Sequence, residues 1–278
     1  MKARFFYVIC SVCMIAAGCL IYGFFIEPKR LLVRDVKVTA PFYQGEAVRI
    51  ALLGDLHIGG RHVPAKRVSK IVEAVNDLNP DMIFIAGDFV DGHHPKEGRT
   101  DSFNRELGEG IKALSGLRSN MGVYSVIGNH DNWYGGRYVK QALEHVGITV
   151  LINEAVQHGT ICVIGLADHD TASPSARAYD DCSAQSHKFV IAHSPDSFAL
   201  LRPQTALAVA GHTHGGQINL PVIGRAVTAT QSGKALAYGL KNLNGTPVFI
   251  TAGIGTSIMP ARFRSPPEIV LLTVRPSP

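Results

Sequence analysis

The first half of the chain alternates between short apolar runs and amphipathic stretches. Three apolar runs that end in polar residues predict buried strands, at residues 48–55, 81–88 and 122–131. Three amphipathic stretches between and after them predict helices, at residues 64–79, 102–117 and 137–145. Alternation of strands and helices is typical of an α/β domain, so we expect these strands to pair in parallel.

Beyond residue 148 the pattern changes to apolar runs separated by turns. Six runs predict strands, at residues 148–156, 160–168, 188–194, 206–214, 246–253 and 268–274. A short helix near residues 196–201 is the only helix expected among them. We therefore expect a second sheet, mixed or antiparallel, packed on the first. Residues 93–101 and 168–186 are polar and contain Gly, Ser, Pro or Asp, so they predict loops.

Residues 5–26 are almost wholly apolar and uncharged. At ~1.5 Å per residue this stretch spans ~33 Å, which is enough to cross the hydrocarbon core of a bilayer. We favour a retained transmembrane anchor. A cleaved signal peptide and a lipoprotein signal at residues 16–19 (AAGC) stay open as alternatives. Basic residues flank both ends, so the sequence does not predict which side of the membrane the domain occupies.

These patterns divide the chain into three parts. We expect an N-terminal transmembrane anchor at residues 1–30, a linker and entry segment at residues 31–47, and one domain at residues 48–278. A domain of this size can bury a sizeable core without disulfides or a structural metal.

Charge and cysteine content narrow the range of partners. The formal net charge is +5, which suits an anionic partner such as a phosphate group or an acidic lipid, although basic residues that merely solvate the surface give the same balance. No run of Lys and Arg is interleaved with aromatic residues, so we expect no nucleic-acid partner. Five cysteines without a paired pattern indicate neither a disulfide framework nor a zinc ribbon. Cys162, within an apolar run, is expected to be a small buried hydrophobic residue.

Metal-competent side chains follow five of the predicted strands. The segments are GDLH (54–57), GDFVD (87–91), GNHD (128–131), AHS (192–194) and GHTHGG (211–216). Sites in α/β sheets form at the C-terminal ends of strands, so these side chains are expected to meet. A mixture of imidazole and carboxylate ligands, with one amide oxygen, suits Mn, Fe, Zn or Co better than Ca or Mg. The pattern predicts two divalent cations that share a carboxylate, as in dinuclear hydrolytic sites.

The spacing of two of these motifs suggests how ligands converge. Residues i and i+2 of a strand point to the same face, so Asp55 and His57 are expected to reach one metal from an extended strand. His212 and His214 have the same spacing.

In this order, the five motifs resemble those of the calcineurin-like metallophosphoesterase superfamily, over about residues 48–274. The resemblance implies a four-layer α/β/β/α sandwich of two mixed sheets, here preceded by one transmembrane helix. It also implies a dinuclear centre in which a metal-bridging hydroxide attacks phosphorus. Of the possible metals, the resemblance favours Mn, and Fe, Zn or Co are alternatives.

The resemblance assigns a role to each motif residue. Asp55, His57 and His214 would bind the first metal, and Asn129, His193 and His212 the second, with Asp88 bridging the two. His130 would stabilise charge or protonate the leaving oxygen, oriented by Asp131 or a neighbouring acid.

Further motifs resemble the membrane-associated bacterial branch of this superfamily. They include Glu27-Pro28, HSPD (193–196), GHTHGGQI (211–218), GIGTS (253–257) and PPEIV (266–270). The resemblance implies a single-pass protein of the bacterial inner membrane, and it suggests that Arg262 contacts a substrate phosphate. The expected reaction is hydrolysis of a phosphodiester or pyrophosphate in a lipid-linked substrate such as UDP-2,3-diacylglucosamine.

Two other functions remain as alternatives. One is a general phosphodiesterase without lipid preference, and the other is an inactive protein that binds the cell envelope. The filled ligand positions argue against the second. The oligomeric state is left open. Several further residues have weaker claims to the site and are more often packing or loop residues: His62, Asp91, His93, His94, Trp133, Tyr134, Arg137 and Asp168.

Overall fold

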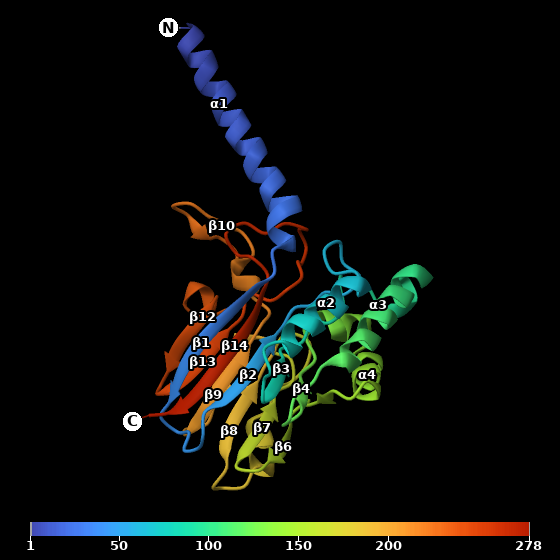
Figure 1. Cartoon of the computed structure of the whole chain (residues 1–278), viewed down its shortest axis with the longest axis vertical. Helices are drawn as coiled ribbons and strands as arrows, with labels where there is room; N and C mark the ends of the chain where they lie inside the picture. Colours follow the sequence, from blue (N-terminus) through green and yellow to red (C-terminus); the bar gives the residue numbers. More distant parts are fainter. Residues whose placement is uncertain (1, 278) are drawn as a thin grey trace.

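The computed structural model describes the backbone of residues 2–277 and the side chains of residues 4–277. Two six-stranded sheets pack face to face, and their strands extend between the lower end of the molecule and the end that lies near helix α1 (Lys2–Ile21) (Figure 1). The strands of the first sheet, in spatial order, are β1 (Leu32–Ala40), β14 (Glu268–Pro276), β2 (Val48–Leu53), β3 (Met82–Ile85), β4 (Val123–Ser125) and β5 (Thr149–Val150). Those of the second are β12 (Gly239–Leu243), β13 (Thr246–Ile250), β9 (Thr205–Ala210), β8 (His187–Ile191), β7 (Ile161–Gly165) and β6 (Glu154–His158).

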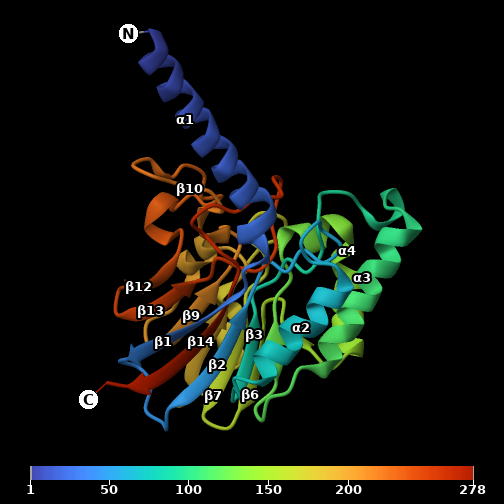
Figure 2. The same cartoon turned by 45° about the horizontal axis from the view of Figure 1, so that its top comes forward.

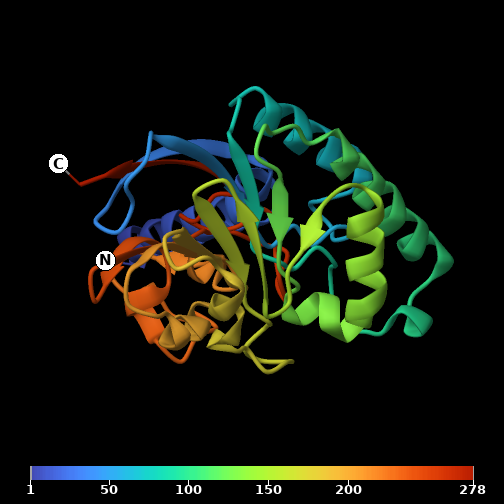
Figure 3. The same ribbon diagram turned by 90° about the horizontal axis from the view of Figure 1, so that it is seen from below.

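The first sheet has the parallel core that the sequence predicts. Strands β2, β3, β4 and β5 pair in parallel, whereas β14 lies antiparallel to β2. The outer face is covered by α2 (Ala65–Asn76), α3 (Asp101–Ala113) and α4 (Asn129–His145), which lie to one side of the sheets in Figure 3. The third predicted helix begins eight residues too late, because the GNHD motif itself opens α4 and Gly135, with φ of 141°, interrupts the helical pattern.

The second sheet is mixed, as expected, but it is more parallel than antiparallel. Strands β7, β8, β9 and β13 run in parallel, and β6 and β12 add antiparallel edges. Two expected members differ: β14 joins the first sheet, and the run at residues 148–156 divides into β5 of the first sheet and β6 of the second. Among the described residues, the outer face carries the 3₁₀ helices η5 (Ala176–Asp181), η6 (Pro195–Leu200) and η8 (Gly233–Leu236). The fourth layer is therefore built from 3₁₀ turns instead of α-helices.

The space between the sheets is filled by apolar side chains from both. Phe84 and Leu52 of the first sheet meet Phe189 and Phe249 of the second, all at most 2% exposed. Each such side chain contributes about 1.5–3 kcal/mol relative to exposure in water. This core fixes the two sheets against each other, so the loops at their C-terminal ends are held at one edge.

The N-terminal segment is helical and leaves the domain. Helix α1 (Lys2–Ile21) continues through a π-helical turn (Tyr22–Ile26) and a 3₁₀ turn (Glu27–Lys29), and it projects away from the sheets (Figures 1 and 2). By length and composition, residues Arg4–Lys29 are able to cross a membrane. The expected linker at residues 31–47 contains β1, which pairs in parallel with β14 and therefore belongs to the first sheet.

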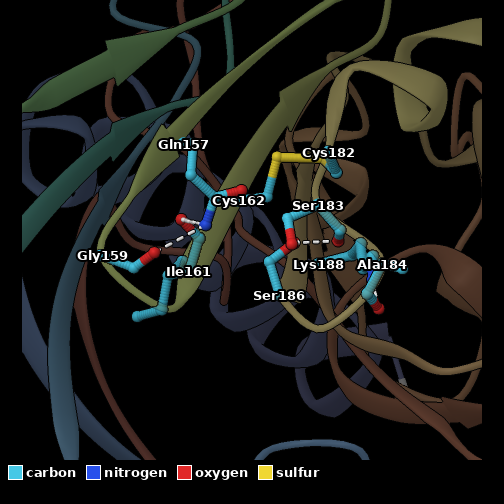
Figure 4. Close-up of a disulfide and its surroundings, with 9 residues drawn as sticks. All are labelled: Gln157, Gly159, Ile161, Cys162, Cys182, Ser183, Ala184, Ser186 and Lys188. Atoms are coloured by element: carbon cyan, nitrogen blue, oxygen red, sulfur yellow. Dashed lines mark hydrogen bonds between the residues drawn. A yellow bond between two sulfur atoms is a disulfide. The ribbon is translucent and has the colours of Figure 1, made fainter.

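Cys162 of β7 forms a disulfide with Cys182, which follows η5 (Figure 4). The expectation that Cys162 is buried holds, but its role as an unpaired hydrophobic residue is wrong. The bond ties the second sheet to the polar loop that covers it. Two cysteines separated by 20 residues form no recognisable pattern, so cysteine spacing did not reveal the pair.

Candidate metal centre

The seven predicted ligands gather where the strands of both sheets end. Asp55 and His57 follow β2, Asp88 follows β3, and Asn129 opens α4 just beyond β4. From the second sheet, His193 follows β8, and His212 and His214 follow β9. Side chains from both sheets therefore meet at one edge of the sandwich. All but His212 are at most 5% exposed.

Asp55, His57 and His214 form the first cluster. The Nε2 atoms of His57 and His214 lie 3.1 Å apart, and His214 Nε2 lies 3.8 Å from Asp55 Oδ1. The backbone N–H of His212 donates to Asp55 Oδ1 at 2.9 Å, which fixes the carboxylate. Three ligand atoms thus converge on one point, as a cation of the Zn or Mn class requires.

Asn129, His193 and His212 form the second cluster. Asn129 Oδ1 lies 2.9 Å from His193 Nε2 and 3.1 Å from His212 Nδ1. His193 Nδ1 lies 2.7 Å from Ala86 O, so in the neutral tautomer it donates to that carbonyl and leaves Nε2 free as a ligand. His212 faces the cluster with Nδ1, and its Nε2 lies 3.3 Å from Asp170 Oδ2.

Asp88 lies between the two clusters. Its Oδ2 is 3.7 Å from His57 Nε2 and 3.3 Å from His193 Nε2. Its Oδ1 accepts the backbone N–H of His130 at 2.9 Å. A single carboxylate therefore faces both groups of histidines, which is the position of a bridging ligand.

Asp55 and His57 reach one cluster, as expected, but the backbone at these ligands is not the extended strand on which that expectation was based. Asp55, His57, Asp88, His212 and His214 all have positive φ, between 48° and 67°. This left-handed conformation costs about 1–3 kcal/mol for each residue other than glycine and is concentrated at functional sites. As a result, His212 and His214 turn to different clusters instead of sharing one metal.

Two glycines leave room for this arrangement. A Cβ on Gly87, whose φ is +81°, would stand 2.8 Å from Gly128 N and 3.0 Å from His193 Nδ1. A Cβ on Gly253 would stand 2.6 Å from Asp55 Oδ2. Glycine at these positions allows the backbone to approach the ligands closely.

Burial controls protonation in the metal-free chain. Burial lowers the pKa of His57 to about 3 and moves the pKa of His214 well below its usual value, so both are neutral, as metal-ligating imidazoles are. Burial raises the pKa of Asp55 to about 7. Burial also opposes charge on Asp88 and His193, but their mutual attraction overrides it, lowering the pKa of Asp88 and raising that of His193. A cation would replace the proton held between them.

His130 lies beside the clusters, but Asp131 does not orient it. His130 Nδ1 is 2.8 Å from Gly92 O, and its Nε2 is 3.2 Å from Ser257 Oγ. Both Asp131 oxygens accept backbone N–H groups, from Phe89 and Val90 at Oδ1 and from Gly128 at Oδ2. Asp131 therefore holds the loop after β3 against the start of α4. The Gly92 carbonyl orients His130, and the neighbouring acid Asp88 lies farther away, with its Oδ2 3.9 Å from His130 Nε2.

Arg262 is fully buried and turned away from the pocket. Its Nε donates to Gly255 O at 2.9 Å, Nη1 to Ser265 O at 2.8 Å and Nη2 to Ala252 O at 2.8 Å. A guanidinium engaged in this way does not reach a substrate phosphate, so that expectation is wrong. Arg262 instead holds together the loop that packs behind His214.

A pocket of about 520 Å³ opens over the clusters. Four candidate ligands and several apolar residues line it; the ligands are Asp88, Asn129, His212 and His214. The apolar contributors are Trp133, Ile218, Ala226, Val227, Ala229, Ile258 and Met259. Of the weaker candidates, His93 and Trp133 line this pocket, with His93 and His130 ring centroids 4.6 Å apart.

Asp91 also lies near the first cluster, with its Oδ1 3.9 Å from His57 Nδ1. Two other weak candidates are engaged elsewhere, and two contributors to the site were missed. His62 binds Pro260 O, and Asp168 holds its own loop through Thr171. Asp170 and Ser257 were not identified. Asp170 sits in a polar loop without a motif, whereas Ser257 ends the GIGTS segment, which did offer a signal.

Comparison with known proteins agrees with this geometry. A family model described as calcineurin-like phosphoesterase matches residues 48–216. An uncharacterized metallophosphoesterase of Helicobacter pylori is 30% identical over 238 residues, covering 82% of this chain and 60% of the relative. Phosphodiesterase YaeI of Escherichia coli is 28% identical, with 81% of each chain covered. The uncharacterized metallophosphoesterase YkuE of Bacillus subtilis is 25% identical, covering 94% of this chain and 93% of the relative.

Proposed function

This chain belongs to the calcineurin-like metallophosphoesterases, and from that premise we propose that it is a metal-dependent phosphoester hydrolase that uses two divalent cations to hydrolyse a phosphodiester or pyrophosphate bond in an amphiphilic substrate. The observation that supports this most is the pair of ligand clusters that share Asp88. Because the chain spans about three-fifths of the length of the Helicobacter relative, the activity of the whole chain is part of the proposal.

The donor atoms present fit two cations. The first would be held by Asp55, His57 and His214, and the second by Asn129, His193 and His212, with Asp88 between them. Two carboxylates and several neutral imidazoles balance the charge of two dications, and the N/O donor set suits Mn, Fe, Zn or Co. Bound there, the cations would supply Lewis acidity and a water of lowered pKa.

The chain's own residues account for the rest of the proposed chemistry. His130 Nδ1 is held by Gly92 O, so Nε2 is the atom that faces Ser257 and exchanges a proton with the substrate. Burial lowers the pKa of His130, which makes its protonated form a stronger acid for the leaving oxygen but a smaller population. The candidate ligands other than His212 are buried, which strengthens their electrostatic interactions relative to those in water.

A lipid-linked substrate is supported by two observations. The chain carries an apolar helix long enough for a bilayer, and the pocket walls include exposed apolar side chains such as Ile258 and Met259. UDP-2,3-diacylglucosamine combines a pyrophosphate with two acyl chains and is one member of this class. A general phosphodiesterase without lipid preference is the second candidate, because a relative with 28% identity is named a phosphodiesterase.

The test of the reaction uses the purified full chain with Mn²⁺ and an aryl phosphodiester. We expect turnover by the parent chain, loss of turnover in Asp88→Asn, and full turnover in Asp181→Asn, which removes an exposed carboxylate outside the site. Equal turnover by the parent and Asp88→Asn would refute the dinuclear site.

Mass spectrometry of products from UDP-2,3-diacylglucosamine then tests the substrate class: release of UMP and acylated sugar phosphate supports a lipid-linked substrate. Turnover of the aryl diester alone supports the second candidate.

The disulfide bears on which side of the membrane the domain occupies. Disulfides are rare in reducing cytosol, so the Cys162–Cys182 bond supports a catalytic domain on the oxidising side. A nucleotide-sugar lipid is made from cytoplasmic nucleotides, whereas lipid phosphodiesters are present on both sides. Labelling of spheroplasts with an impermeant, thiol-reactive polymer distinguishes the two sides of the membrane: after mild reduction outside the spheroplast, Cys182 reacts only if the domain faces outward.

A further inference from the structure

Outside α1, large exposed apolar side chains gather on two loops. One is the hairpin of β10 (Asn219–Leu220) and β11 (Gly224–Arg225), where Val222 is 107% and Ile223 61% exposed. The other is the segment 257–259, where Ile258 is 92% exposed. Apolar patches of this kind on a protein surface mark sites that contact another protein or a membrane.

The residues at the hairpin tip are unusual for a tight turn. Val222 has φ of 68°, a left-handed conformation that a β-branched residue rarely adopts and that Asn or Gly fills easily. A Pro-Val-Ile tip in water carries both this strain and the cost of exposing two apolar side chains. Burial in an apolar environment would remove the second cost.

Residues 262 and 263, which follow segment 257–259, connect the hairpin to the π-helical turn after α1. Arg262 N donates to Gly23 O at 2.9 Å, and the rings of Tyr22 and Phe263 lie 6.2 Å apart. Asn219 N in turn donates to Phe263 O at 2.8 Å. In Figures 1 and 2 the hairpin stands beside the end of α1.

Basic side chains surround this junction. Lys29, Arg30, Arg61 and Arg264 are exposed, and the Arg61 guanidinium lies 5.2 Å from the centre of the Phe25 ring. Cations next to exposed apolar side chains match the boundary between acyl chains and anionic headgroups. A protein partner would not require this continuity with a helix that is long and apolar enough to cross a membrane.

We propose that the β10–β11 hairpin and segment 257–259 enter the headgroup layer of the bilayer that α1 crosses, as a second membrane contact. Ile218, Val227, Ile258 and Met259 also line the pocket, so this contact would open the metal site toward the lipid surface. The substrate phosphate would then reach the site while its acyl chains stay in the bilayer. The membrane contact does not depend on the proposed function, whereas this route of access rests on it.

Tryptophan quenching tests the contact without turnover. The chain has one tryptophan, Trp133, so the variant Trp133→Phe contains no tryptophan and serves as the background for single-tryptophan reporters. In that background Val222→Trp reports on the hairpin, and Thr160→Trp reports on the β6–β7 turn at the opposite end of the molecule (Figure 1). The full chain is placed in liposomes with and without brominated phospholipid. We expect emission from Val222→Trp to be lost in brominated liposomes and emission from Thr160→Trp to be retained.

Equal emission from the two reporters would overturn the proposal. Emission from Val222→Trp that changes with protein concentration and not with brominated lipid would assign the surface to a second copy of the chain and would also overturn the proposal.

The access route is tested with the double variant Val222→Asn plus Ile223→Asn, because Asn suits the positive φ at the tip. We expect loss of turnover for a phosphodiester lipid in bilayers, unchanged turnover of a soluble aryl diester, and no loss in Leu240→Asn, an exposed control on β12. Unchanged lipid turnover in the double variant contradicts the route alone.

Discussion

Replacing Asp170 by asparagine should weaken the second metal position and leave the first intact. Asp170 Oδ2 lies 3.3 Å from His212 Nε2, on the side of the ring opposite the Nδ1 atom that faces Asn129 and His193. A carboxylate in this position holds the ring and raises its basicity as a ligand. Asparagine keeps the size of the side chain and removes its charge.

The expected magnitude follows from exposure. Carboxylates behind ligating histidines are typically worth 10–100-fold in metal affinity. The Asp170 side chain is 42% exposed, so solvent screens it and the lower end of that range applies. We therefore expect a loss of about tenfold, which corresponds to about 1.4 kcal/mol.

Asp91→Asn is the matched comparison at the other cluster. Asp91 Oδ1 lies 3.9 Å from His57 Nδ1, beyond hydrogen-bond distance, and its side chain is 31% exposed. Equilibrium dialysis against Mn²⁺, with bound metal counted by mass spectrometry, should show one of two binding steps weakened in Asp170→Asn and neither weakened to that extent in Asp91→Asn. An unchanged affinity in that variant, or an equal loss at both positions, would refute the reasoning.

Three further predictions concern charge, burial and the disulfide. Metal occupancy should fall as pH drops below about 7 in a dialysis series, because Asp55, with its pKa raised to about 7, must lose a proton to bind. The metal-free chain should lose stability as pH rises from about 4 to 7, since the folded form holds that proton more tightly than an unfolded aspartate. A flat pH profile of occupancy or of stability would contradict the corresponding prediction. Arg262→Met should cost several kcal/mol in thermal unfolding, at about 1–3 kcal/mol for each buried carbonyl left without a donor, whereas the exposed Arg105→Met should change little. Reduction of the Cys162–Cys182 bond should cost about 3 kcal/mol for a loop of 20 residues, measured by urea unfolding with and without reductant, and coincident curves would exclude it.

The sequence predicted those parts of the fold whose pattern is local. Strands β2, β3, β4, β8 and β9 are apolar runs that end in ligand motifs, and both their position and their common edge were predicted. Strand β1 was missed because charged residues interrupt its sequence (LVRDVKVTA), as suits an edge strand that is largely exposed. The assignment of β14 to the first sheet depends on pairing across more than 200 residues, which no local pattern encodes.

The candidate ligands were predicted as a set, but the details that orient them were not. Left-handed backbone at Asp55 and His57 is imposed by the loops of two neighbouring strands, which hydrogen-bond to each other beyond the strand ends. The partner of His130 is a backbone carbonyl, and backbone carbonyls carry no sequence signature. Arg262 has a motif position, yet only the packing of its loop shows that the side chain points inward.

The most direct test of the account is a crystal structure of the full chain grown with Mn²⁺, with the anomalous signal of the metal used to locate it. We predict two ions ~3.5–4 Å apart, both within reach of Asp88, one beside Asp55, His57 and His214 and the other beside Asn129, His193 and His212. One ion only, or ions bound away from Asp88, would contradict the central claim.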